Sequence, residues 1–299
     1  MILKLATFNL RCQNDYDRAR NRDFVARRAS IAAQLRAAAP DAVGFQELLP
    51  DMRDWLESEL GDYQFVGVER EAGFGGECNA IAFRKDAVRL HETYTFWLSP
   101  TPSVPGSRFE KQSTCPRVCT VTLLRHRLTG QLFRFLNTHL DHEQEFAMEE
   151  GLKRVFAAAR REQEKQRLPL VITGDFNFTP ASAPHRLIVE NGYEDLAADS
   201  GGTFHDFGAL DRPEKIDYIL SDGSFRRLDL CAWHADGNGR CLSDHDGLMA
   251  RVEAQGGYDD GRAGNGEPRR SGFTDSQHGG AVCRPVLLLC AGNPRRAGR

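Results

Sequence analysis

Short apolar segments separated by polar or turn-forming residues recur along most of the chain, and this spacing is typical of strands. The pattern predicts strands over residues 5–8, 42–45, 63–68, 79–84, 88–90, 95–98, 117–124, 131–137, 169–174, 216–220, 225–233 and 247–253. Thr129 and Gly130 separate two of these segments and predict a hairpin between them.

Helical periodicity is confined to fewer segments. Apolar residues recur at helical spacing over residues 22–39, and Pro40 ends this pattern. Further helices are predicted over 51–60, 143–165 and near 181–191. Many strands and few helices, without regular alternation of the two, indicate an α+β fold built in layers.

Several of the predicted strands end in polar residues that have no place in a core. In the run Gly174-Asp175-Phe176-Asn177, alternate side chains of an extended segment point the same way, so Asp175 and Asn177 share a face. One such segment is equally compatible with a capped turn. Other strand ends carry the same kinds of side chain: Asn9 and Arg11, Gln46 and Glu47, Asn137 and His139, Asp217, and Asp244 with His245. Five or six polar strand ends favour a single convergent site.

The ordered set of these segments resembles the endonuclease/exonuclease/phosphatase superfamily, which has the deoxyribonuclease I-like fold, over residues 1–254. The matching segments are Phe8-Asn9-Leu10-Arg11, Gln46-Glu47, Asn137-Thr138-His139-Leu140, Gly174-Asp175-Phe176-Asn177, Ile216-Asp217-Tyr218 and Ser243-Asp244-His245. The resemblance implies a four-layer αββα sandwich of two mainly antiparallel sheets flanked by helices. The segments 75–84, 95–99 and 116–118 resemble an uncharacterised bacterial branch of that superfamily.

The resemblance also implies a phosphoesterase that uses a divalent cation, Mg²⁺ or Mn²⁺. Hard cations prefer oxygen ligands, and Mg²⁺ often combines one or two carboxylates with water. Glu47 is the leading candidate ligand, and Asn9 and Asp244 are candidates to complete the site.

Hydrolysis of a phosphate ester further requires an activated water and groups that hold the phosphoryl oxygens. Asp175 is the candidate base that aligns the water, with Asn177 beside it. His245 is expected to contact the phosphate and to be oriented by Asp217, because such a pairing fixes the tautomer of an imidazole. His139 is expected to act similarly from the other side.

Three further residues complete the expected site. Glu77 matches the position that supports the second histidine in deoxyribonuclease-like members, which places it behind His139. Arg11 and Arg117 are candidate contacts for the substrate phosphate, since a planar guanidinium suits oxyanions.

Charge distribution narrows the class of substrate. The chain carries a net charge of −3, but residues 255–299 contain seven Arg and four acidic residues, so residues 1–254 hold 32 basic and 38 acidic side chains. Non-specific duplex binding depends on phosphate neutralisation by Lys and Arg, so a general DNase is disfavoured. The segments Lys215-Ile216-Asp217-Tyr218 and Gln46-Glu47-Leu48-Leu49 differ from the usual inositol-phosphatase and abasic-endonuclease motifs. A nuclease acting on ends or single strands and a phosphatase of a small metabolite or lipid stay open.

The remaining features suggest a cytoplasmic protein that is monomeric by default. The sequence has no CxxC pair, no signal-peptide pattern at its start and no apolar run long enough to span a membrane. Residues 255–299 contain ten Gly and little apolar periodicity, which predicts a disordered tail after a catalytic domain at 1–254. A non-catalytic binding module on the same scaffold is the alternative from another functional class.

Overall fold

A computed structural model describes residues 1–256 of the chain, and its strands form two sheets of six strands each. The first sheet has the order β11-β12-β1-β2-β4-β3, and its members are β1 (Ile2–Asn9), β2 (Ala42–Gln46), β3 (Tyr63–Val66), β4 (Ile81–Arg84), β11 (Phe225–Trp233) and β12 (Gly247–Ala254). The second sheet has the order β5-β6-β7-β8-β10-β9, and its members are β5 (Val88–Trp97), β6 (Val118–His126), β7 (Leu132–His139), β8 (Leu170–Asp175), β9 (Glu194–Asp195) and β10 (Asp217–Ser221).

Neighbouring strands are antiparallel except for one parallel pair in each sheet, β1 with β2 and β7 with β8. The two sheets are therefore mainly antiparallel, as predicted. The hairpin expected at Thr129-Gly130 joins β6 to β7, and Gly130 adopts a φ of 74° in the turn.

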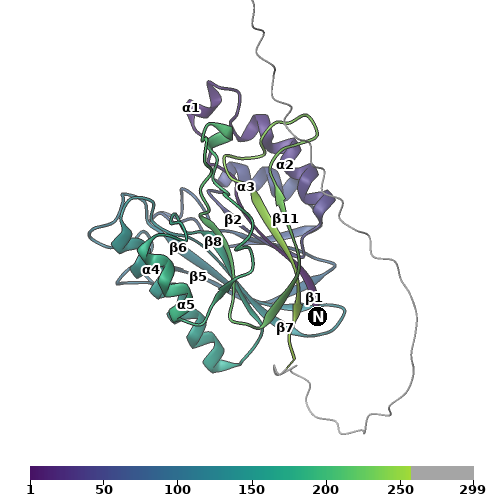
Figure 1. Ribbon diagram of the computed structural model, residues 1–299, viewed down its shortest axis with the longest axis vertical. Coiled ribbons are helices and arrows are strands. Elements are labelled where there is room, and N and C mark those ends of the chain that lie inside the picture. The colour runs from purple at the N-terminus through teal and green to yellow at the C-terminus, as the bar shows by residue number, and fades with distance from the viewer. Residues whose placement is uncertain (257–299) are drawn as a thin grey trace, which may run out of the picture.

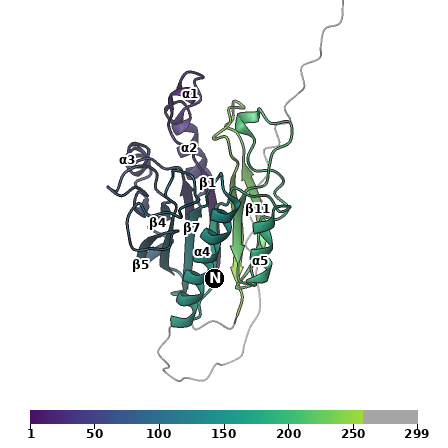
Figure 2. The ribbon, with the colours of Figure 1, turned by 90° about the vertical axis from the view of Figure 1, so that its left-hand side faces the viewer.

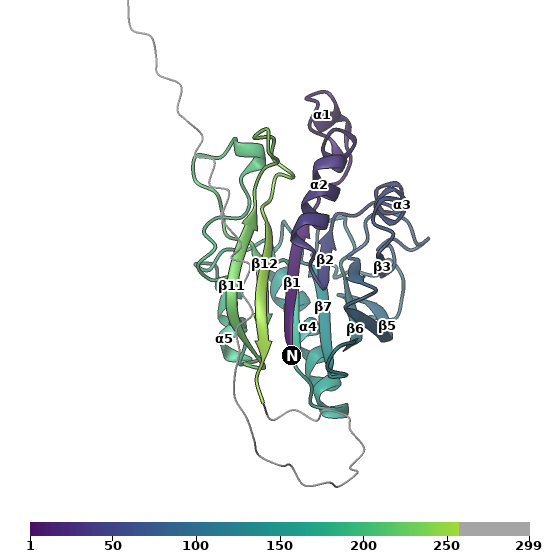
Figure 3. The same ribbon diagram turned by 90° about the vertical axis from the view of Figure 1, so that its right-hand side faces the viewer.

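Helices cover the outer face of each sheet (Figures 1, 2 and 3), so the predicted four-layer αββα sandwich is confirmed. Residues of α2 (Phe24–Ala38) and α3 (Pro50–Glu59) share an apolar cluster with the first sheet. Residues of α4 (Glu145–Lys165) and α5 (Arg186–Glu190) share another with the second sheet. A third cluster contains strand residues from both sheets and fills the space between them. The short helix α1 (Asp15–Arg18) lies at the end of the sandwich toward which β1 runs (Figure 3).

Two sequence expectations differ from the structure in detail. The segments 88–90 and 95–98 are one strand, β5, because the polar residues between them continue the pairing with β6 through a register shift at Leu90 and Glu92. The helix expected near 181–191 is a 3₁₀ turn followed by the short α5, and Gly192 with a φ of 77° follows its end.

The predicted tail at 255–299 lies outside the described residues apart from its first two positions. Within residues 1–256, no helix is both long and apolar enough to cross a membrane.

The space between the sheets changes from apolar to polar along the strands. Side chains alternate between the two faces of a strand, so every second residue of β1, β7 and β8 points into this space. The inward positions are first apolar and then polar: Leu5, Thr7 and Asn9 on β1, Phe135, Asn137 and His139 on β7, and Val171, Thr173 and Asp175 on β8. The polar end of the space between the sheets is where the predicted site residues meet.

Asn137 ties the two sheets together next to this polar end. Its Nδ2 group donates hydrogen bonds to the carbonyl oxygens of Phe45 at 2.8 Å and Ala80 at 2.9 Å. Phe45 lies in β2 and Ala80 directly precedes β4, so both acceptors belong to the first sheet, whereas Asn137 belongs to the second. Gly44 makes this close approach possible, because a Cβ there would lie 2.4 Å from both Asn137 Oδ1 and Thr173 Oγ1.

We expect Gly44→Ala to lower the free energy of unfolding by about 1–3 kcal/mol, the usual cost of overpacking a tightly filled interior. Denaturant unfolding of the purified variant measures the change. Gly61→Ala is the matched control, since a Cβ at Gly61 would meet nothing within 4 Å. Equal stability of the two variants would contradict the packing described here.

Candidate active site

Three of the predicted site residues follow strand ends with unusual backbone conformations. Arg11, Glu47 and Asn177 have φ values of 56°, 59° and 55°, in the left-handed region that non-glycine residues seldom occupy. Such conformations cost on the order of 1 kcal/mol or more and cluster at functional sites. They turn the chain sharply just after β1, β2 and β8, next to the polar end of the space between the sheets.

Asp175 is the centre of the cluster. Its Oδ2 atom accepts a hydrogen bond from Asn9 Nδ2 at 2.9 Å and lies 3.5 Å from His139 Nε2 and 3.7 Å from His245 Nε2. Its Oδ1 atom accepts from the Asn177 amide at 3.0 Å. The structure thus brings together five residues from four separate segments of the sequence.

His245 is held in place by a carboxylate. His245 Nδ1 donates to Asp217 Oδ2 at 2.8 Å, and the ring of Phe204 packs 4.9 Å from the His245 ring. Burial favours the neutral imidazole, but the negative charges of Asp217 and Asp175 outweigh it and raise the pKa of His245 to about 10. The imidazole therefore carries a proton at neutral pH, with its Nε2–H group directed toward Asp175.

The hydroxyl group of Thr203 holds the backbone at Asp217. The backbone amides of Ile216 and Asp217 both donate to Thr203 Oγ1 at 3.2 Å, which fixes the start of β10. Asp217 Oδ1 is buried and has no hydrogen-bond partner.

Glu47 is arranged as an ionised carboxylate. Asn9 Nδ2 donates to Glu47 Oε1 at 3.1 Å, and the Cys12 amide donates to Oε2 at 2.8 Å. Burial raises the pKa of Glu47, but the hydrogen bonds from Cys12 and Asn9 and the charge of His245 outweigh it, so the pKa lies below its ordinary value.

Asp244 and Arg11 lie next to this carboxylate. Arg11 Nη1 is 3.4 Å from Asp244 Oδ2, while Arg11 Nε donates to Asp17 Oδ2 at 2.8 Å. The Arg11 side chain is 30% exposed, so its guanidinium is accessible to an anion in solution. Burial raises the pKa of Asp244, and the charge of His245 opposes that rise.

The donor set fits a divalent cation. Burial raises the pKa of Asp175 to about 7, although the charge of His245 opposes the rise, and this carboxyl lies near Asp217 and the ionised Glu47. Excess buried carboxylate of this kind is what a hard cation neutralises. Asp175, Asp217 and His245 have ligand atoms that all lie within 4.8 Å of one another and could hold a metal ion.

Glu77 does not support His139 as expected. Its carboxylate pairs with both terminal nitrogens of Arg70, at 2.6 and 2.9 Å, and His139 Nδ1 is buried without a partner. A guanidinium fork matches two carboxylate oxygens, which a single imidazole N–H cannot do. Burial and the charge of Glu47 raise the pKa of Glu77 to about 7.

Arg117, the second candidate contact for the substrate phosphate, lies inside the protein. Its side chain is buried, with Nη2 donating to His142 Nδ1 at 2.8 Å and with Nε and Nη1 enclosed and unpaired. After burial itself, the charges of Arg117 and Arg70 are the largest causes of a His139 pKa well below its ordinary value. Burial and the charges of Arg117 and Arg70 therefore keep the imidazole of His139 neutral.

A buried arginine that the sequence reasoning missed connects the elements that carry the site. Arg27 is fully buried, and its Nη1 and Nη2 groups donate to the carbonyls of Leu242 at 2.5 Å and Leu10 at 2.9 Å. Its position between Phe24 and Ile31, on the apolar face of α2, was the available signal. It joins the segment after β1 to the loop that precedes Asp244.

The fold and this centre define a class of protein: a four-layer sandwich with a carboxylate and imidazole cluster between its sheets. The model of the Endonuclease/Exonuclease/phosphatase family matches residues 6–245, and the chain belongs to this family. No curated protein sequence matches the chain significantly.

Solved structures give the same assignment. The endonuclease/exonuclease/phosphatase from Bacteroides vulgatus is 28% identical with a TM-score of 0.78, and the match covers 85% of this chain and 100% of that one. The mannosyl-6-phosphatase of Bacteroides thetaiotaomicron is 28% identical with a TM-score of 0.78, covering 84% and 99%. A functionally unknown conserved protein from Enterococcus faecalis is 26% identical with a TM-score of 0.77, covering 85% and 100%.

We expect Asp217→Asn to lower the pKa of His245, because it removes the anion that stabilises the imidazolium. Histidine side-chain NMR titration of chelator-treated protein measures this pKa, and the exposed His91 provides an internal control. Since the pKa of His245 in the folded protein, about 10, is raised, its stabilising contribution is complete below about pH 6.5 and is lost as the pH rises toward 10. An unchanged His245 titration in the variant would contradict the pairing.

Proposed function

We propose that this protein is a divalent-metal-dependent phosphoesterase that hydrolyses a small phosphorylated metabolite, with a sugar phosphate as the leading substrate class. The convergence of Asn9, His139 and His245 on one oxygen of Asp175 carries the proposal. A carboxylate surrounded by an amide and two imidazoles has no use in a core and suits hydrolysis at phosphorus.

Asp175 is the proposed acceptor of the proton from the attacking water. A pKa of about 7 balances availability of the carboxylate with its basicity at neutral pH. Asn177 Nδ2 donates to the Leu140 carbonyl at 3.1 Å, which leaves Asn177 Oδ1 free to hold that water.

The two histidines are the proposed contacts for the phosphoryl oxygens. His245 has its Nδ1 occupied by Asp217, so its Nε2–H can donate to an oxygen that gains negative charge. His139 is the last residue of β7, and its Nε2 atom lies 3.5 Å from the same oxygen of Asp175. Because its imidazole stays neutral, it acts as a hydrogen-bonding group and not as a second cation. Arg11 is the proposed additional contact at the exposed side of the cluster.

Glu47, Asp244 and Asn9 are the proposed residues that hold Mg²⁺ or Mn²⁺. Glu47 is preferred over the group of Asp175, Asp217 and His245, because His245 Nδ1 is occupied by Asp217 and because Mg²⁺ prefers oxygen ligands. Asn9 Oδ1 accepts the Arg11 amide at 2.9 Å and has a second lone pair for a cation. When bound, the ion would neutralise charge that develops on the phosphoryl group.

Two observations support a small phosphorylated substrate over nucleic acid. The Bacteroides thetaiotaomicron relative at 28% identity is a mannosyl-6-phosphatase. The excess of acidic over basic side chains in residues 1–254 disfavours binding to a polyanion. A nuclease acting on strand ends is the competing activity.

We expect Asp175→Asn to reduce hydrolysis of p-nitrophenyl phosphate or bis-p-nitrophenyl phosphate by about 10²–10⁴-fold, the usual contribution of a general base. EDTA should abolish the wild-type activity, and added Mg²⁺ or Mn²⁺ should restore it. Nitrophenolate release measures both effects.

Asp199→Asn is the control for that experiment, since Asp199 pairs with Arg227 away from the cluster and should keep wild-type activity. Wild-type turnover by Asp175→Asn would refute its role as the base. No turnover of any ester by the wild-type protein would favour the non-catalytic binding module.

Among natural esters, we expect phosphate release from mannose 6-phosphate or glucose 6-phosphate to exceed cleavage of a single-stranded DNA or RNA oligonucleotide. Initial rates with Mg²⁺ at equal concentrations of phosphate ester make the comparison. Faster cleavage of the oligonucleotide would assign the protein to the nucleases of its family.

A further inference from the structure

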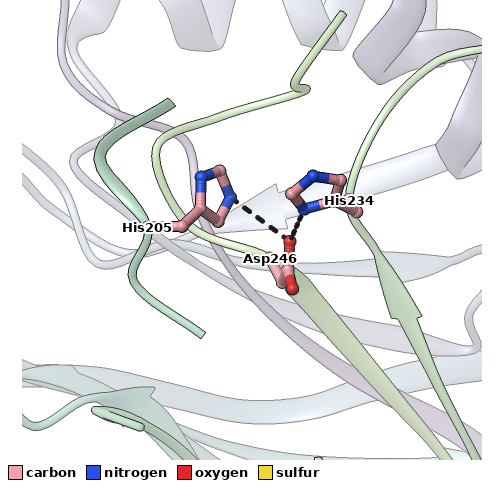
Figure 4. A group of neighbouring side chains, drawn as sticks. All are labelled: His205, His234 and Asp246. Carbon is pink, nitrogen blue, oxygen red and sulfur yellow. Dashed lines mark hydrogen bonds and ion pairs between the residues drawn. The ribbon is translucent and has the colours of Figure 1, made fainter. Parts of the chain in front are cut away.

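A second cluster of potential metal ligands lies beside the active site (Figure 4). His205 Nε2 is 3.3 Å and His234 Nδ1 is 2.7 Å from the same atom, Asp246 Oδ1. Ligand atoms of all three residues lie within 4.8 Å of one another. None of the three belongs to the segments that resemble the family motifs.

The three residues come from separate segments that meet only in the folded chain. His205 lies in the connection between β9 and β10, His234 follows the last residue of β11, and Asp246 precedes the first residue of β12. Backbone hydrogen bonds join the first and last of these segments, from the His205 amide to the Asp244 carbonyl at 2.9 Å and from the Asp246 amide to the Thr203 carbonyl at 2.8 Å.

His205 is the residue whose placement demands an explanation. Its side chain is 3% exposed, and within residues 1–256 the only polar contact of its buried Nε2 atom is the 3.3 Å ion pair with Asp246 Oδ1, which does not meet the geometry of a hydrogen bond. A ligand bound between His205, His234 and Asp246 would satisfy this nitrogen.

Cys241 is a candidate fourth ligand next to His234, although its thiol lies outside the group whose ligand atoms are all within 4.8 Å of one another. It pairs with Ala235 across a short hairpin, which places it opposite the residue after His234. The Cys241 side chain is a hydrogen-bond partner of the His234 imidazole, and this thiol is not in a disulfide. Imidazole, carboxylate and thiolate groups together are typical ligands of zinc in a closed tetrahedral site.

We propose that His205, His234, Asp246 and Cys241 form a structural zinc site beside the active centre. The ligand atoms of His205, His234 and Asp246 need only small adjustments, because adjacent ligand atoms of a tetrahedral zinc site lie about 3.3 Å apart, whereas the Cys241 side chain must turn toward them. His234 is half-exposed and Asp246 is 16% exposed, so an ion has a route from solvent.

Zinc binding requires specific protons to leave. The proton that His234 Nδ1 now shares with Asp246 and the thiol proton of Cys241 are released as the ion takes their place. His205 Nδ1 accepts from the Gly208 amide at 3.1 Å, so its proton must move from Nε2 to Nδ1. The Gly208 amide would then lose its bond to His205 Nδ1 but keep its other acceptor, the His205 carbonyl at 2.9 Å.

A metal at this place would fix the surroundings of the proposed catalytic histidine. Asp246 follows His245 directly, and His205 follows Phe204, whose ring packs on the His245 ring. The ion would clamp these two segments to the end of β11, so its role is to position His245 and not to take part in hydrolysis.

The test uses full-length protein carrying Glu47→Gln, which weakens the proposed catalytic metal site and leaves the second cluster intact. After incubation with ZnCl₂ and gel filtration, we expect one zinc per chain by elemental analysis. With Co²⁺ as the probe, we expect an intense thiolate charge-transfer absorption. Zinc should also raise the melting temperature, because binding to the folded state stabilises it.

His234→Ala in the Glu47→Gln background should weaken zinc binding at least tenfold and remove most of the thermal shift. Cys241→Ser should remove the charge-transfer absorption. His91→Ala and Cys115→Ser are the matched controls for losing a histidine or a free thiol elsewhere, and both should behave like the parent protein.

Absence of retained zinc in the parent protein would overturn the proposal, as would unchanged zinc affinity in the His234→Ala variant. Both readouts are independent of turnover, so a failure of this proposal is distinguishable from a failure of the proposed hydrolytic activity. Melting of the metal-free variants in the absence of zinc verifies that each one is folded.

Discussion

The active site depends on how closely the two sheets approach each other. Asn9 and Glu47 belong to the first sheet, whereas Asp175 and His139 belong to the second, so the cluster exists only where the sheets meet. The hydrogen bond from Asn9 Nδ2 to Asp175 Oδ2, 2.9 Å long, crosses that boundary directly. Gly44 and Asn137 set the distance between the sheets next to this cluster. The side chain of Asn137, on the second sheet, donates to the Phe45 carbonyl of the first sheet, and only a glycine at position 44 leaves room for it. A wider gap would leave two half-sites, each with unpaired buried polar groups.

Burying this many ionisable groups is costly, and the structure offsets the cost with specific partners. Glu47 is stabilised as an anion by two N–H donors, and His245 is stabilised as a cation by two carboxylates. Asp175 also accepts two hydrogen bonds, but burial and the nearby charge of Asp217 raise its pKa to about 7. The pKa values of the three residues differ because each one has its own combination of burial, neighbouring charges and hydrogen-bond partners.

Much of the arrangement could be predicted from the sequence, and the errors have a common cause. The strands, the hairpin at Thr129-Gly130 and the polar strand ends follow from local periodicity, which a linear chain displays. The four-layer arrangement came from family resemblance, because periodicity does not say which faces pack together. The support expected from Glu77 was wrong, because Arg70, which no motif marks, competes for that carboxylate. The burial of Arg117 likewise became visible only in the fold, since the exposure of a side chain depends on the residues that cover it.

The sequence by itself determined which residues are candidates for the site and on which strand end each one lies, because the alternation of side chains along a strand is a local property. Only the tertiary structure decided which of them share an oxygen atom, which are ionised, and which are buried behind others. It also brought together His205, His234 and Asp246, which are widely separated in the sequence and match no motif. These outcomes depend on contacts between the two sheets and between loops, and the strength of a buried charge interaction is set by surroundings that distant segments provide.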